Sequence, residues 1–218
     1  EKFSEINRNY NHGSISAALS AFKRYTLFLE KVASVNSNER IYSPQWFYDG
    51  AQSKELKAFE QEAVTLRQDF CSRFGVAQIS ALSGKDLLTH LFYSGTENKD
   101  SLCYILEFHP KIRGVFGSIV GGSAFKYGLF YHQKKHCWMT GSPTKPKALT
   151  EEEAIKVATE IRDNLVAGAK VIEAHGVLDS VADYEKLYAE LQNIDGIDTV
   201  WVLKYYQMLY PDVLPTFY

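Results

Sequence analysis

The stretch that decides the fold is residues 101–140, SLCYILEFHPKIRGVFGSIVGGSAFKYGLFYHQKKHCWMT. Four short runs in it are rich in aromatic and β-branched residues: 101–108, 115–120, 125–132 and 137–140. Glycines or polar clusters separate these runs, which is the pattern of antiparallel strands joined by short turns. The glycine pair at 121–122 and the polar sequence at 133–135 are the predicted turns. This segment therefore predicts a meander of about four strands.

Apolar residues at helical spacing lie on both sides of this meander. On the N-terminal side they predict helices at 14–34 and 53–74, and a short helix that follows Ser83 as its N-cap. On the C-terminal side Thr150 and Glu153 form a capping-box pattern at the start of a long helix that ends near His175. Two more helices are predicted at about 180–192 and 199–209. We therefore predict an α+β fold, with a central antiparallel sheet flanked by N-terminal and C-terminal helices.

Length and composition predict a single domain over residues 1–218. Its parts are a helical region at 1–99, the β meander at 100–148 and the C-terminal helices at 149–218. The 218 residues are 45% apolar, which is enough for a core. No run approaches the roughly 18 consecutive apolar residues of a membrane helix. Three cysteines without CxxC spacing, and no signal-peptide pattern, predict a protein of the reducing cytoplasm.

The charge of the chain is distributed unevenly, although its formal net value is only −2. The 43 residues between Glu107 and Glu151 contain no acidic side chain, so the rest of the chain carries 17 basic against 26 acidic residues. A segregated basic segment attracts polyanions to one face, so we expect nucleic-acid binding here. The alternative is a basic strand segment that is balanced by acidic helices of the same fold. The basic residues of the segment are Lys111, Arg113, Lys126, Lys134, Lys135, Lys145 and Lys147, with His109, His132 and His136.

The glycine-rich sequence at 117–123, GSIVGGS, is the second candidate feature. Backbone N–H groups of such a turn can bind a phosphate, and hydroxyl groups can add to the site. It matches neither the Walker loop nor the dinucleotide-binding fingerprint, and the alternative is a hairpin turn or bulge. We predict that the DNA phosphate contacts come from this turn and from the basic side chains near it: Lys126, Lys134, Lys135, Lys145, Lys147, Arg113, Ser118 and Ser123.

Aromatic side chains make up 14% of the chain, and most of them are expected in the core. A few could instead stack on an exposed or flipped base. Trp46, Tyr48 and Trp138 are the predicted stacking residues.

Patterns of catalytic residues are incomplete. Asp100, Glu107 and Lys111 are too far apart in the sequence for a metal-dependent nuclease strand. His132, His136 and Cys137 lie close together in the sequence, but they lack the fourth ligand of a metal site. The G-x-S-x-G pattern of a nucleophile elbow does not occur. We therefore predict no catalytic residue, no metal site and no cofactor.

Several strings resemble the amino-terminal region of McrB-like AAA+ restriction proteins. They are residues 101–108, FGSIVGGSAFKYGLF at 116–130, WMTGSP at 138–143, the helical sequence at 151–172, and WVLKYYQMLYPDVLPTFY at 201–218. The last string resembles the segment that leads into the AAA+ motor. In that family the motor hydrolyses GTP and recruits a separate nuclease, while the amino-terminal region chooses the DNA, often through modified bases.

The resemblance implies a DNA-binding specificity domain of a restriction or phage-defence system. This chain contains no Walker A or Walker B motif, so it would not itself be an enzyme. The implied partners are double-stranded DNA, the protein's own motor domain and a separate nuclease subunit, with no membrane. The alternative is a protein-interaction module that assembles an AAA+ defence complex.

Overall fold

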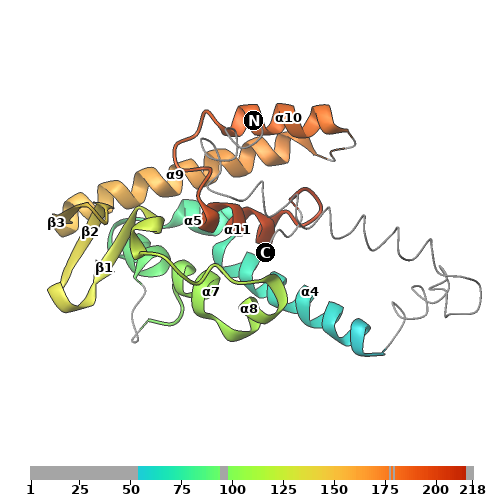
Figure 1. Cartoon of the computed structure of the whole chain (residues 1–218), viewed down its shortest axis with the longest axis horizontal. Coiled ribbons are helices and arrows are strands. Elements are labelled where there is room, and N and C mark those ends of the chain that lie inside the picture. Colours follow the sequence, from blue (N-terminus) through green and yellow to red (C-terminus); the bar gives the residue numbers. More distant parts are fainter. Residues whose placement is uncertain (1–53, 94–97, 177, 179, 215–218) are drawn as a thin grey trace, which may run out of the picture. The chain divides into compact units, whose positions relative to one another are not determined.

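The computed structural model describes residues 54–93, 98–176, 178 and 180–214 (Figure 1). By its internal contacts the chain divides into residues 1–58 and residues 59–218, and apart from the start of the first helix all elements below belong to the second unit. The helix predicted at 14–34, with Trp46 and Tyr48, lies outside the described residues. Those predictions, and that of a single domain over 1–218, stay predictions.

Four helical elements precede the basic segment. They are α4 (Lys54–Phe74), α5 (Val76–Ala81), α6 (Gly84–Leu87) and the π-helical turn η1 (Leu88–Phe92). The helix predicted at 53–74 is confirmed as α4, and Ser83 occupies the N-cap position of α6 as predicted. Leu87, Leu88 and Leu91 are buried and attach this pair of turns to the core.

The first two predicted strands, 101–108 and 115–120, are wrong. The structure has α7 (Leu102–Phe108) in place of the first, and the end of α8 (Pro110–Phe116) followed by a loop in place of the second. Each helix has a local start signal: Ser101 Oγ accepts a hydrogen bond from the Tyr104 N–H at 3.2 Å, and Pro110 occupies the first turn of α8. Five of the seven residues of α7 are buried, so its sequence is a nearly continuous apolar run. Such a run does not distinguish a buried helix from a buried strand.

The sheet has three antiparallel strands among the described residues, compared with about four expected. They are β1 (Leu129–His132), β2 (Cys137–Ser142) and β3 (Lys145–Leu149), in that order across the sheet. The predicted strand at 125–132 begins instead as the 3₁₀ turn η2 (Ala124–Tyr127), and Gly128 adopts a left-handed conformation before β1. The predicted turn at 133–135 is the 3₁₀ turn η3 (Gln133–Lys135).

Three helices follow the sheet: α9 (Glu151–His175), α10 (Val181–Leu191) and α11 (Val200–Leu209). All three were predicted, and α9 begins with the expected capping box. Thr150 Oγ1 accepts from the Glu153 N–H at 3.2 Å, and the Thr150 N–H donates to Glu153 Oε2 at 2.9 Å. In Figure 1 the sheet lies at the start of α9 and α10 lies along its other half.

Helix α11 is part of the core and connects α4 with α9. Seven of its ten residues are buried. Tyr205 Oη donates to the Phe74 carbonyl oxygen at 2.9 Å, and Tyr206 Oη donates to the Leu165 carbonyl oxygen at 2.9 Å. The described part of the chain is therefore a mixed α+β structure dominated by helices. None of its described helices is long and apolar enough to cross a membrane.

Candidate nucleic-acid interface

The sheet carries four of the predicted phosphate-binding lysines. Lys134 and Lys135 lie in the turn between β1 and β2, while Lys145 and Lys147 lie on β3, and all four are exposed. No acidic residue occurs in the whole sheet, from residue 129 to residue 149. We call this unit of residues 129–149 the basic sheet. With four lysines and no acidic residue, it is a positively charged unit of the fold.

Lys134 and Lys135 lie at one end of the basic sheet and Lys145 lies at the other, with Lys147 between them. The register pairs Tyr131 with Trp138 and Trp138 with Leu149, so the β1–β2 turn lies at the end where β3 runs into α9. Lys145 pairs with Ser142 at the other end. The six residues of β2 between these ends span roughly 17 Å. The four lysines are thus spread along the sheet and do not form the single cluster that the sequence suggested.

At the α9 end, Lys134 and Lys135 are presented by a tight turn. His136 closes it with a φ of 49°, a left-handed conformation that is uncommon for a residue other than glycine. The His136 N–H donates to the Gln133 carbonyl oxygen at 3.3 Å. Both lysine side chains therefore project into solvent from a turn with a defined backbone, and neither forms an ion pair with another described residue.

At the far end, the turn between β2 and β3 combines lysine with two hydroxyl groups. Ser142 Oγ lies 3.1 Å from Thr144 Oγ1 and accepts from the Lys145 N–H at 3.1 Å. Lys147 is in the middle of β3, and its Nζ lies 3.7 Å from Glu153 Oε1 in the first turn of α9, an exposed pair that contributes little to stability. β3 is also an edge strand with Pro146 between its lysines, and lysine and proline both protect edge strands from unwanted pairing.

Lys126 is engaged inside the molecule, which counts against its predicted phosphate contact. Its Nζ lies 2.6 Å from Glu107 Oε1 and donates to the carbonyl oxygens of Ile119 and Gly121, each at 3.0 Å. Tyr127 Oη donates to the other Glu107 oxygen at 2.6 Å. The Glu107 residue is only 7% exposed. Helix α7 places this last acidic residue before the basic segment next to Lys126, so the ammonium group is neutralised by the same fold.

Burial governs the ionisation of the groups around this pair. It raises the pKa of Tyr127 far above its ordinary value, so the phenol stays a neutral hydrogen-bond donor. It also raises the pKa of the buried Cys103 thiol well above its ordinary value. The Glu107–Lys126–Tyr127 group is therefore a saturated internal network, and each of its three polar groups has its partner within 2.6 Å.

The 117–123 loop is built differently from a phosphate-binding turn. Carbonyl oxygens of Gly117, Ile119 and Gly121 accept hydrogen bonds from two lysine ammonium groups, those of Lys204 and Lys126. A phosphate site needs N–H groups directed at the ligand, whereas here the carbonyl groups are directed at cations. Gly121 and Gly122 have φ values of 123° and 69°, a backbone conformation that favours glycine whether or not the loop binds a ligand.

Other residues of the loop region have local roles. Ser118 Oγ accepts from the Val120 N–H at 3.2 Å, and Ser123 Oγ accepts from the Phe125 N–H at 3.3 Å at the start of η2. Arg113 is exposed on α8. Burial, with a smaller contribution from the positive charge of Arg113, lowers the pKa of Lys204 to about 8. These contacts shape the loop and bring no further lysine to the basic sheet.

Trp138 is 8% exposed, which counts against base stacking in this conformation. Its ring packs between Tyr93 and Tyr131, with centroid distances of 6.2 and 5.3 Å. The residue therefore attaches the basic sheet to the core. Trp46 and Tyr48, the other predicted stacking residues, fall in the part of the chain that is not described.

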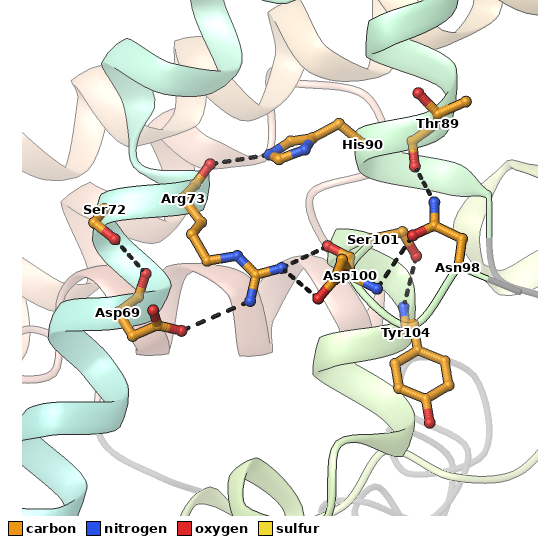
Figure 2. A network of polar contacts seen from close by, with 9 residues as sticks. All are labelled: Asp69, Ser72, Arg73, Thr89, His90, Asn98, Asp100, Ser101 and Tyr104. Carbon is orange, nitrogen blue, oxygen red and sulfur yellow. Dashed lines mark hydrogen bonds and ion pairs between the residues drawn. The ribbon is translucent and has the colours of Figure 1, made fainter.

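Arg73 organises a network that the sequence did not indicate (Figure 2). Its Nη2 donates to the carbonyl oxygen of Asp100 at 2.8 Å and to Asp100 Oδ1 at 3.3 Å, while its Nη1 lies 3.7 Å from Asp69 Oδ2. His90 Nε2 lies 3.1 Å from the Arg73 carbonyl oxygen. Two carboxylates neutralise the guanidinium group, so it is not an anion site. The network positions the turn that starts α7, and through α7 it positions Glu107.

A cavity of about 100 Å³ lies between η2, α9, α11 and the turn at 195–199. Its walls include the aromatic residues Tyr127, Trp201 and Tyr206, and Asp195 also lines it. A cavity of about 150 Å³ is known to hold benzene. This one is smaller, and a carboxylate nearby repels phosphate, so the cavity does not suit a flipped base.

Among the described residues no group of three His, Cys, Asp or Glu side chains is arranged to hold a metal ion. Comparison of the chain with protein-family models, with curated proteins and with solved structures gave no match.

Proposed function

We propose that this chain is a DNA-binding specificity domain of a McrB-like restriction or phage-defence system, and that it contacts duplex DNA through the basic sheet. The observation that carries the proposal is the basic sheet itself: it has two exposed lysines on β3, two more in the turn between β1 and β2, and no acidic residue. The restriction-system part of the proposal, with a motor domain and a nuclease subunit as partners, rests on the sequence resemblance alone.

The spacing of the lysines suits a duplex backbone. The two ends of the basic sheet are roughly 17 Å apart, which corresponds to about five base-pair steps along the helix axis. Lys134 and Lys135 would then contact phosphates at one end and Lys145 at the other, with Lys147 between them. These contacts position the protein and carry no sequence information, so base recognition requires other residues. Trp46 and Tyr48 remain the predicted stacking residues.

The salt dependence of binding tests the electrostatic part of the proposal. Because Lys126 is neutralised internally, two to four phosphate contacts remain, so the slope of log K against log salt should be about −2 to −3.5. Affinity for a duplex should therefore fall between about 10-fold and about 100-fold from 50 to 200 mM salt. A flat response would remove the electrostatic claim.

Charge reversal locates the contact. Reversing Lys134 and Lys135 to Glu should weaken duplex binding strongly and reduce the magnitude of the slope by about 2. Lys145→Glu should reduce it by about 1. The matched control reverses Lys156 and Lys170, which are exposed on α9 outside the basic sheet, and it should leave binding unchanged. Equal losses in both double variants would mean that only net charge matters.

The alternative, a module for protein assembly, is favoured by the exposed apolar residues of α10. Under that alternative duplex binding should survive reversal of Lys134 and Lys135. A panel of modified and unmodified duplexes at one stated salt concentration then tests specificity. Equal affinity for every duplex would contradict a specificity role even if binding is electrostatic.

A further inference from the structure

Two sulfur atoms lie in contact on strand β2. Cys137 Sγ is 3.6 Å from Met139 Sδ, and both residues face the same side of the sheet because side chains alternate along a strand. Cys137 is a free, half-buried thiol, whereas Met139 is only 3% exposed. The proposed DNA contacts use neither residue. A thiol and a thioether at this separation are two soft ligands that one metal ion can bind at the same time.

Strand β1 adds an imidazole on the same face of the sheet. The register pairs His132 with Cys137 and Phe130 with Met139. Directly opposed residues of an antiparallel pair have Cβ atoms about 4.5–5.5 Å apart, so the His132 side chain is a neighbour of the Cys137 thiol. The centroid of the His132 ring is 6.3 Å from that of Phe130, as expected for two residues on one face. The three ligand groups therefore come from two paired strands, whose register fixes their spacing.

The separation of the sulfur atoms fits a shared metal ion. Sulfur ligands lie about 2.3 Å from a small metal ion, so two sulfur atoms 3.6 Å apart would subtend an angle of about 100° at the ion. This angle is close to the tetrahedral angle and leaves room for a nitrogen ligand on the side of β1. The two sulfur atoms thus stand at a chelating distance without any change of the backbone.

The ligand types and the charge of the basic sheet select the ion. Thiolate and thioether groups favour Cu(I), whereas Mg²⁺ and Ca²⁺ require oxygen ligands. The basic sheet has no carboxylate, and its four lysines disfavour a divalent cation. Zn²⁺ would need four nitrogen, oxygen or thiolate ligands, and the described residues hold no suitable group of three His, Cys, Asp or Glu side chains. Cu(I) carries a single charge, which the Cys137 thiolate would balance.

The thioether side of the sulfur pair is dry, and the thiol side is open to solvent. Phe130 lies opposite Met139, is 8% exposed and packs against Phe125 with the ring centroids 4.9 Å apart. An apolar shell of this kind limits the access of water to a metal and so favours the lower oxidation state. Cys137 and His132 are half-buried, so an ion from solvent can reach them.

We propose that Cys137, Met139 and His132 form a Cu(I) site at the end of the basic sheet. On binding, the Cys137 thiol releases its proton to solvent and its sulfur bonds to copper. Met139 Sδ and one nitrogen of His132 donate lone pairs, and the copper keeps its oxidation state. His132 and Cys137 flank the turn at 133–135, so the ion would link β1 to β2 at the base of that turn. The proposal does not rest on DNA binding, and its tests contain no nucleic acid.

NMR of labelled methionine methyl groups tests the thioether contact in the whole chain, which contains only two methionines, Met139 and Met208. Met208 is fully buried in α11 and serves as the internal reference. One equivalent of Cu(I), added without oxygen, should shift the methyl signal of Met139 and leave that of Met208 in place. One equivalent of Zn²⁺ should shift neither signal. A Met139 signal that does not move with Cu(I), or equal shifts of both signals, would overturn the proposal.

Competition with bathocuproine disulfonate, a coloured chelator of Cu(I), measures the affinity of each variant. The wild type should take one Cu(I) per chain. Removing a ligand should weaken binding at least about 10-fold, the lower limit found even for outer-shell partners of a metal, so Cys137→Ser, Met139→Leu and His132→Phe should each show this loss. The matched control is Cys71→Ser, at a second half-buried cysteine outside the basic sheet, and it should bind like the wild type. Unchanged affinity in any of the three ligand variants, or a loss in Cys71→Ser, would rule out the three-ligand site.

Discussion

Replacing Lys126 by Met should destabilise the fold without weakening DNA binding by the folded protein. The substitution keeps the length of the side chain but removes the charge that faces Glu107 at 2.6 Å. Glu107 is 7% exposed and would retain the hydrogen bond from Tyr127, but its negative charge would be buried without a cation. Removing one partner of a buried ion pair costs about 3–5 kcal/mol.

The lower end of that range is the better estimate, because the Lys126 side chain is 20% exposed and water can partly replace the ammonium group. A loss of about 3 kcal/mol in a unit of this size lowers Tm by about 6–12 °C. The double variant Lys126→Met with Glu107→Leu removes both charges, and Tyr127 keeps its second acceptor, the Cys103 carbonyl oxygen at 3.3 Å. It should be more stable than Lys126→Met, with an interaction energy of about 2 kcal/mol.

Thermal and denaturant unfolding of the wild type, both single variants and the double variant give the complete cycle. Duplex binding, measured well below the lowest Tm, gives the salt slope of each folded variant. A Lys126→Met variant that loses less than about 0.5 kcal/mol would refute the burial of the pair. Unchanged stability together with a smaller salt slope would show that Lys126 contacts phosphate.

Two further perturbations test the core. Stability should rise as pH increases from about 8 towards 10, because the pKa of Lys204 is lowered to about 8 and the unfolded chain binds more protons in that window. Above about pH 10 stability should fall, because burial raises the pKa of Tyr206 and only the unfolded phenol ionises. Thermal melts of the wild type and of Lys204→Met over this pH range check both effects, and the variant should lack the rise between about pH 8 and 10. Gly168→Ala would place a methyl group against Tyr206 Oη, so denaturant unfolding should show a loss of about 1–3 kcal/mol; an unchanged midpoint would contradict this packing.

Local signals in the sequence determined most of the helices. The capping box of Thr150 and Glu153 predicts the start of α9, because a helix end is stabilised by side chains within four residues of it. Ser83 predicts the N-cap position of α6, although its side chain makes no capping hydrogen bond there. The polar composition of residues 133–135 likewise predicts the turn there. Interactions between residues only a few positions apart can be recognised from the sequence alone.

Whether a segment forms a strand depended on contacts with residues that are distant in the sequence. The run 101–108 has strand-like composition but forms α7, because it is buried on nearly all sides and its N-cap decides the conformation. β3 was not predicted, since KPKAL is polar and contains proline. It forms a strand because β2 supplies hydrogen bonds along one edge, and Pro146 is tolerated on an edge strand.

The sequence alone determined that residues 108–150 carry no acid, and hence that a basic element exists in the fold. Only the tertiary structure decided which of its cations face solvent. An ion pair depends on distance in space, and Glu107 lies 19 residues from Lys126 in the chain but 2.6 Å from its ammonium group. Lys134 and Lys135 lie in an exposed turn, where no carboxylate from another described element reaches them.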